Sequence, residues 1–246
     1  MTPPKPYYQD DLATIYRGDS FDILPYLSGI GAVVTDPPYS SGGAFRGDRM
    51  QSTSTKYVQT GTQAYRPEFA GDNRDQHSFL VWASLWLNAA RNACVPGAVL
   101  ASFIDWRQLP TLSDAIQAGG WTWRGIAVWS KGFGRPTPGR FSNAAEYVLW
   151  GSLGAMAERD AYPPGLFTAQ PPRGEREHIA QKPDEVMGWV LGLVPPGAVV
   201  LDPFMGSGST LVAAKSLGFR CVGIECDERY CETAARRVSQ EMALSF

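Results

Sequence analysis

The chain has few of the residues that bind metal ions or form disulfide bridges. Its 246 residues include only two histidines and four cysteines, namely Cys94, Cys221, Cys226 and Cys231. The last three cysteines are spaced five residues apart, which matches neither a Cys-x-x-Cys zinc pattern nor a dense disulfide framework. We therefore expect reduced thiols and no metal site.

Long apolar runs are also absent, and neither sign of charge dominates. No run of about 18 apolar residues occurs, so the sequence predicts no membrane-spanning helix. The first residues, MTPPKPYYQDD, lack the apolar stretch of a secretory signal. The formal net charge is −2, so any affinity for a polyanion must come from local basic patches. We expect a cytoplasmic protein that does not contact a membrane.

Hydrophobic residues make up 44% of the chain, which is enough for one sizeable core and predicts a single domain over residues 1–246. Short apolar runs alternate with stretches of helical spacing, which is typical of an α/β fold with a mainly parallel sheet. The predicted strands are residues 13–17, 32–35, 98–103, 124–129, 146–150, 198–201 and 220–225. The predicted helices are residues 77–93, 109–118, 183–193, 209–217 and 228–242. Pro96-Gly97 is predicted as a turn that enters the strand at 98.

Two segments do not fit this alternation. Residues 40–76 are rich in Gly, Ser, Thr, Gln and Tyr, and they are too numerous for an ordinary connection in a compact domain. We interpret them as a functional loop or lid at the active site. Residues 151–177 are irregular and contain Pro163-Pro164-Gly165 and Pro171-Pro172.

A glycine-rich turn follows the predicted strand at 198–201 and leads into a helix. Glycine lets the backbone pass close to a ligand, and the next strand ends in Glu225, whose carboxylate can accept hydrogen bonds from ribose hydroxyls. Leu211 stands where a dinucleotide-binding loop has its third glycine. This favours S-adenosylmethionine, which has no pyrophosphate, over a nicotinamide or flavin cofactor; the alternative is a tight structural turn. The candidate loop contacts are Asp202, Phe204, Gly206, Ser207, Gly208, Ser209 and Thr210.

The strand at 32–35 runs directly into Asp36-Pro37-Pro38-Tyr39. At the carboxyl edge of a parallel sheet, these residues place a carboxylate, a rigid carbonyl and an aromatic face together. An exocyclic amino group is a poor nucleophile because its lone pair is delocalised into the ring. Asp36 and the Pro37 carbonyl can accept its two hydrogens, while Tyr39 can stack on a flipped base. The alternative is a Pro-Pro turn in which Asp36 is only a cap.

Together the two motifs resemble the N6-adenine and N4-cytosine DNA amino-methyltransferases, in the permuted β-type order with the tetrad before the cofactor loop. Arg17 to Leu24 resembles the Gly-Asp element of that family, which implies that Asp19 contacts the cofactor adenine. His178 to Pro183 resembles the His-x-x-x-Lys-Pro element, which implies that Lys182 helps to hold the methionine end. Val128 to Lys131 and Glu146 to Leu149 resemble the late strand pair near the target base.

The resemblance implies a Rossmann-like fold: a seven-stranded, mostly parallel sheet with helices on both faces and a late antiparallel strand pair. It implies methyl transfer from S-adenosylmethionine to adenine N6 in DNA, within a bacterial or phage-encoded restriction-modification context. Relatives of this order also form homodimers. Asp at the first tetrad position favours adenine, whereas Ser is commoner for cytosine N4, which is the alternative. RNA and glutamine methyltransferases generally carry Asn there and place the cofactor loop first. A non-catalytic DNA-binding scaffold of the same fold is a further alternative.

Basic residues mark the expected DNA path. Residues 115–145 contain no Asp or Glu, and residues 40–76 follow the tetrad directly, so cations in both segments suit phosphate contacts. The candidate DNA-binding residues are Arg46, Arg49, Lys56, Lys131, Arg135 and Arg140. Only residues 151–177 remain for target recognition, which predicts a short or relaxed recognition sequence.

Overall fold

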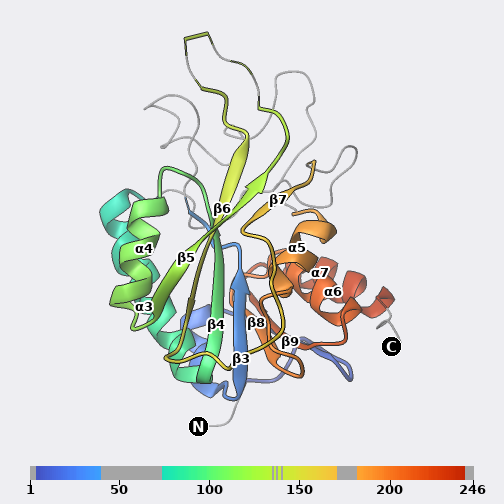
Figure 1. Ribbon diagram of the computed structural model, residues 1–246. Helices are drawn as coiled ribbons and strands as arrows, with labels where there is room; N and C mark the ends of the chain where they lie inside the picture. Colours follow the sequence, from blue (N-terminus) through green and yellow to red (C-terminus); the bar gives the residue numbers. More distant parts are fainter. Residues whose placement is uncertain are drawn as a thin grey trace.

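A computed structural model describes residues 4–39, 74–134, 136, 138–139, 141–170 and 182–241. In these residues one sheet of nine strands runs through the molecule, with helices on both of its faces (Figure 1). The strands are β1 (Tyr8–Gln9), β2 (Ala13–Arg17), β3 (Ile30–Thr35), β4 (Cys94–Ile104), β5 (Thr122–Ser130), β6 (Ala145–Ser152), β7 (Leu166–Thr168), β8 (Val199–Asp202) and β9 (Arg220–Glu225). The helices are α1 (Ser20–Ile23), the short 3-10 helix η1 (Leu24–Tyr26), α3 (Gln76–Ala93), α4 (Leu109–Ala118), α5 (Asp184–Leu191), α6 (Ser209–Ser216) and α7 (Glu228–Gln240).

The strand order is β1-β2-β9-β8-β3-β4-β6-β5-β7. The five strands from β2 to β4 in this order pair in parallel, and β6 lies antiparallel between β4 and β5. The structure therefore confirms the predicted α/β fold with a mostly parallel sheet and a late antiparallel pair.

Both faces of the sheet are covered by apolar helix surfaces. On one face α3 and α4 pack over the sheet, with Phe79 and Trp86 fully buried, whereas α5, α6 and α7 cover the other (Figure 1). Successive residues of β4 alternate between the two cores, as Val99 and Leu100 do. Because central parallel strands are buried on both faces, they appear in the sequence as continuous apolar runs.

The seven predicted strands are present, and β1 and β7 add two short ones at the sheet edges. Strands of two and three residues have too little periodicity to be recognised from sequence. β4 also begins earlier than predicted: Pro96 and Gly97, expected in a turn before the strand, lie inside it. They coincide with a register shift against β3, where Ile30 pairs with Cys94 but Ala32 with Val99.

The two irregular segments are described only in part. Most of the predicted active-site loop, residues 40–73, lies outside the described residues, and so do residues 171–177 of the predicted recognition segment. Within 151–170, the first two residues complete β6 and Leu166–Thr168 form β7 by pairing with β5. The Trp129 indole then donates a 2.9 Å hydrogen bond to the Ala169 carbonyl, which fixes the end of this segment.

Some general properties follow from the described residues. None of their helices is both long and apolar enough to cross a membrane. No group of three or more His, Cys, Asp or Glu side chains among them could hold a metal ion. All four cysteines are free thiols in the structure.

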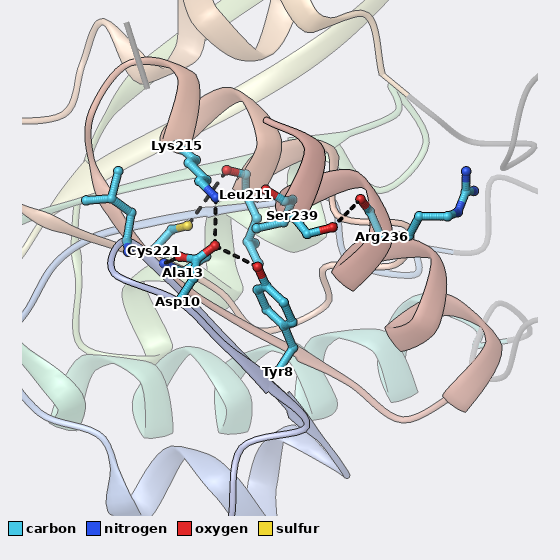
Figure 2. A network of polar contacts seen from close by, with 10 residues as sticks. Tyr8, Asp10, Ala13, Leu211, Lys215, Cys221, Arg236 and Ser239 are labelled. Atoms are coloured by element: carbon cyan, nitrogen blue, oxygen red, sulfur yellow. Dashed lines mark hydrogen bonds and ion pairs between the residues drawn. The ribbon is translucent and has the colours of Figure 1, made fainter. Parts of the chain in front are cut away.

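A charged cluster fastens the amino-terminal hairpin to the helices α6 and α7 (Figure 2). Tyr8 Oη and Lys215 Nζ both donate to Asp10 Oδ2, over 2.7 and 2.6 Å. Two backbone N–H groups of the hairpin donate to Oδ1 over 2.9 and 2.7 Å, and Lys215 also donates to the Val238 carbonyl of α7 over 2.9 Å. Burial opposes the charge of Asp10, but these hydrogen bonds outweigh it and lower its pKa to about 2.

Asp10→Asn should lower the free energy of unfolding by about 2 kcal/mol at neutral pH. The lowered pKa means that the stabilisation is complete above the ordinary value of 3.8 and is lost as the pH falls toward 2. Urea unfolding of wild type and variant should therefore give a deficit at pH 3 that is about half of that at pH 7. The exposed neighbour Asp11 provides the control variant Asp11→Asn. A deficit that does not change with pH would contradict an ionic origin.

Candidate active site

The predicted tetrad and the predicted cofactor loop follow two neighbouring strands. β3 ends at Thr35 and continues into Asp36, and β8 ends at Asp202, where the glycine-rich loop begins. The strands pair in parallel, and the Thr35 hydroxyl donates a 2.7 Å hydrogen bond to Asp202 Oδ1. Both motifs therefore lie at the carboxyl edge of the sheet, where open α/β sheets bind ligands.

Asp202 lies buried beneath the loop. It also accepts hydrogen bonds from the Thr210 hydroxyl, over 2.5 Å, and from the Phe204 backbone N–H, over 3.0 Å, and only 2% of the residue is exposed. Burial raises the pKa of Asp202 to about 6, although these hydrogen bonds act in the opposite direction. Asp202 and Thr210 thus shape the loop from inside the protein; their contact with a cofactor stays a prediction.

Two glycines allow the loop to turn tightly. Gly206 and Gly208 have φ angles of +51° and +82°, in the left-handed region that favours glycine. A Cβ atom on Gly208 would lie 2.8 Å from the Cβ of Ala234 on α7, so the loop also packs closely on that helix. Glu225 Oε2 accepts a 3.1 Å hydrogen bond from the Gly206 N–H. The loop backbone and the predicted ribose-binding carboxylate are therefore in direct contact.

Arg237 of α7 holds the same loop from another side. Its Nη1 donates to the Ser207 carbonyl over 2.7 Å and to the hydroxyls of Ser207 and Ser209 over 3.3 Å each. No pattern in the sequence indicates this contact, because Arg237 lies on a separate helix 30 residues beyond Ser207. Arg237 is a loop-supporting residue that sequence reasoning missed.

Asp19 and Glu225 also come together. Asp19 follows β2 and Glu225 ends β9, and these two strands pair in parallel with Arg17 opposite Glu225. The Gly18 N–H also donates to the Glu225 carbonyl over 2.9 Å. Asp19 caps α1 by accepting a 2.8 Å hydrogen bond from the Phe21 N–H. The two carboxylates that the sequence analysis links to adenine and ribose are therefore neighbours at one edge.

A buried chain of alternating charges begins at the tetrad. Lys182 Nζ lies 2.5 Å from Asp36 Oδ2 and 3.3 Å from Glu146 Oε2, and Lys131 Nζ lies 2.6 Å from Glu146 Oε1. The resemblance assigns Lys182 to the methionine end of the cofactor, but in the structure its ammonium contacts the tetrad carboxylate. Glu146, which was placed only in the late strand pair, is a site residue that sequence reasoning missed.

The charges in this chain sustain one another. Burial opposes the charge of Lys182, whose side chain is 7% exposed, but Asp36 and Glu146 outweigh burial and raise its pKa to about 12. Burial likewise opposes the charge of Glu146, and the ammonium groups of Lys182 and Lys131 lower its pKa below the ordinary value. Lys182 is therefore protonated beside Asp36 at neutral pH.

Aromatic side chains of α3 line the inner side of the site. The Phe204 ring lies 5.2 Å from the rings of both Trp82 and Trp86, and the Arg74 guanidinium lies 4.2 Å above Trp82. Tyr39 is partly buried against the same core. The tetrad and the loop thus share one aromatic wall.

The structure describes one of the predicted DNA-binding residues. Lys131 is paired with Glu146 and lies 5.3 Å from the Trp129 ring. The others lie outside the described residues: Arg46, Arg49, Lys56, Arg135 and Arg140. Their role in DNA binding stays a prediction.

The fold and the two motifs at its carboxyl edge define a class, the α/β methyltransferases. The chain is similar in structure to M1.HpyAVI in its complex with SAM, with a TM-score of 0.66 and 22% identity over 92% of this chain and 99% of that one. It is also similar to the PvuII DNA methyltransferase, described as cytosine-N4-specific, with a TM-score of 0.72 and 18% identity over 95% and 88% of the two chains. At these identities the likeness establishes the fold.

Sequence comparison gives the family. The chain is similar to the type II methyltransferase M2.LlaDCHI of Lactococcus lactis subsp. cremoris, with 23% identity over 96% of this chain and 93% of the relative. It is 27% identical to the type II methyltransferase M.HinfI of Haemophilus influenzae, over 94% and 69% of the two chains. The family model for N6 and N4 methyltransferases, described as DNA methylase, matches residues 30–236. The chain belongs to this DNA methylase family, whose members transfer a methyl group from S-adenosylmethionine to an exocyclic amino nitrogen of a DNA base.

Gly208→Ala tests the packing of the loop. The added Cβ would crowd Ala234 and would sit at a left-handed φ, so we expect a loss of more than about 2 kcal/mol in unfolding free energy and weaker S-adenosylmethionine binding. Gly218→Ala is the matched control, because Gly218 has φ +76° and open space around its Cβ position. It should cost only about 1 kcal/mol and leave cofactor binding unchanged. Urea unfolding and calorimetric titration measure both effects; equal losses would exclude the steric contact as the cause.

Proposed function

We propose that this DNA methyltransferase modifies the N6 amino group of adenine. The observation that carries the proposal is the Asp-Pro-Pro-Tyr sequence at the carboxyl end of β3, one strand from the glycine-rich loop of β8. Asp at the first position favours adenine within the family that the sequence resembles. Cytosine N4 carries a chemically similar amino group, and it is the second outcome that the assay below distinguishes.

The tetrad supplies two acceptors in a fixed arrangement. Asp36 and the Pro37 carbonyl accept the two amino hydrogens of the target base, which favours a more tetrahedral and more nucleophilic nitrogen. Tyr39 stacks on the flipped base, and such stacking contributes about 1–3 kcal/mol toward the cost of flipping. The cation of Lys182, 2.5 Å away, keeps Asp36 ionised before the target base binds.

The residues around the loop fit S-adenosylmethionine. Bound there, the cofactor supplies an electrophilic methyl group on a sulfonium. Glu225 has the carboxylate that two ribose hydroxyls need, Asp19 lies beside it for the adenine amino group, and the glycine loop leaves backbone exposed to a close ligand. Ser207 and Ser209 are held by Arg237 so that the loop keeps its shape.

The hairpin between β5 and β6 supports the proposed DNA path. It projects beyond the sheet edge that bears the tetrad (Figure 1), and it carries Lys131 together with the exposed rings of Phe133 and Phe141. Trp121 and Trp129, by contrast, are buried in the core. We propose that this hairpin, with Lys131, Arg135 and Arg140, and the loop at 40–76, with Arg46, Arg49 and Lys56, contact the DNA backbone.

The proposed recognition segment is small, and its described part is attached to the methyltransferase fold. Arg159 donates to the carbonyls of Leu193 and Val194, over 2.5 and 3.0 Å. The Trp189 indole of α5 donates to the Pro164 carbonyl over 2.8 Å. These contacts attach the segment to α5 and the residues that follow it, and its small size supports a single domain with a short or relaxed recognition sequence.

The methylated nucleoside that the enzyme produces identifies the target base. Purified protein, unmethylated DNA and isotopically labelled S-adenosylmethionine should yield labelled N6-methyladenine when the DNA is digested to nucleosides and analysed by mass spectrometry. Labelled N4-methylcytosine would transfer the assignment to the second candidate. Cofactor binding without any DNA product would point to RNA, to protein or to a scaffold role.

Asp36→Ala should lower kcat by at least about a hundredfold, since it removes one of the two acceptors used in the transition state. The Kd for S-adenosylmethionine should stay within about threefold of wild type, because the loop on β8 keeps its own hydrogen bonds. The exposed Asp114 of α4 offers the matched control Asp114→Ala, with normal kcat. Normal turnover by Asp36→Ala would refute the assigned role.

A further inference from the structure

One oxygen of Glu146 is buried in an unusual state. Oε1 is paired with Lys131, but Oε2 is buried and accepts no hydrogen bond from the residues that the structure describes. Lys182 Nζ lies 3.3 Å from Oε2, close enough for an ion pair. This ion pair offsets the burial of Oε2, but its distance is longer than that of a strong charge-assisted hydrogen bond, so the ammonium has room to approach.

Lys182 lies between two carboxylates at unequal distances. Its Nζ is 2.5 Å from Asp36 Oδ2 and 3.3 Å from Glu146 Oε2, while the Phe103 ring lies 5.1 Å away. A lysine ammonium has three donors at the end of a flexible stem. A small rotation of that stem is enough to make Glu146 the nearer partner.

The closer partner belongs to the carboxylate that the reaction needs. In the proposed function Asp36 accepts a hydrogen of the target amino group, yet Lys182 already donates to Asp36 Oδ2. The amino group and the lysine would then share one carboxylate, and each donor would weaken the other's hydrogen bond. If Lys182 left Asp36 without another carboxylate nearby, its buried ammonium would be unpaired, which is strongly unfavourable.

We infer that Glu146 is a positioning residue that receives Lys182 when the target amino group occupies Asp36. Lys182 then shifts from Asp36 to the waiting Oε2 of Glu146, and the tetrad carboxylate becomes available to the base. The four side chains Asp36, Lys182, Glu146 and Lys131 sum to zero charge before and after the shift. No covalent bond changes. This inference rests on the proposed role of Asp36.

Lys131 holds the carboxylate of Glu146 in place. It holds Oε1 of Glu146 over 2.6 Å and is itself 26% exposed, so it is the end of the charge chain nearest to solvent. With Oε1 held in this way, Oε2 stays directed toward Lys182. This arrangement explains why Oε1 of Glu146 is held by Lys131 while Oε2 stays available to Lys182.

The test is Glu146→Gln, which keeps the size of the side chain and removes its charge. We expect kcat at saturating DNA and cofactor to fall by about tenfold to a hundredfold, because Lys182 remains on Asp36. The Kd for S-adenosylmethionine should stay near that of wild type, whereas the thermal midpoint should fall, because removing one partner of a buried ion pair is destabilising. Glu146→Asp should restore part of kcat. Glu232→Gln, at an exposed position of α7, is the matched control with normal kcat.

A double-mutant cycle separates repositioning from structural support. In Lys182→Met there is no ammonium to relocate, so adding Glu146→Gln should change kcat by less than about threefold. Far-ultraviolet circular dichroism and cofactor titration identify the variants that fold. If Lys182→Met does not fold, the comparison of Glu146→Gln with Glu146→Asp decides alone. Multiplicative losses in the double variant would overturn the inference.

The two levels of proposal fail in different ways. If wild type methylates no base, the proposed function fails. If wild type is active and Asp36→Ala is inactive while Glu146→Gln keeps full kcat, only the inference about Glu146 fails. A lowered thermal midpoint with unchanged kcat would likewise reduce Glu146 to a structural residue and overturn the inference.

Discussion

The parallel pairing of β3 with β8 is the constraint on which the whole site depends. It places Thr35 within 2.7 Å of Asp202, although they are 167 residues apart in the chain. The two strands deliver the tetrad and the glycine loop to the same edge at the same height. A slip of one residue would turn every side chain of a strand to the opposite face. The buried hydrogen bond between Thr35 and Asp202 favours the correct register.

The second constraint is the cost of burying charge next to the tetrad. A buried ion pair gains little over apolar side chains of similar volume, and losing one partner is strongly destabilising. Stability alone therefore does not explain the row of ion pairs that runs from Asp36 through Lys182 and Glu146 to Lys131. In the proposed function its value lies in chemistry, because it keeps the partly buried carboxylate of Asp36 ionised. The amino-terminal cluster around Asp10 differs, since it stabilises the hairpin and lies apart from the described residues of the site.

Most of the fold could be predicted because the central strands are buried on both faces and appear as uninterrupted apolar runs. The bounds of α4 and β9 agree with the prediction to the residue. β1 and β7 were missed, since two or three residues carry no periodic signal, and Pro96-Gly97 was misplaced because such a pair usually marks a turn. Within the site, contiguous motifs were recognisable, whereas Arg237 and Glu146 were not, because their partners lie on other elements.

The sequence by itself determined the order of the elements, the two contiguous motifs and the resemblance to DNA amino-methyltransferases, since these depend on residues that are adjacent in the chain. Only the tertiary structure decided which charges meet. Lys182 stands two residues before α5 and Asp36 follows β3, and no spacing rule connects them. Their contact depends on how α5 packs against the sheet. Hydrogen bonds and ion pairs require distances of a few ångströms, and only packing and strand register fix distances between residues so far apart in sequence.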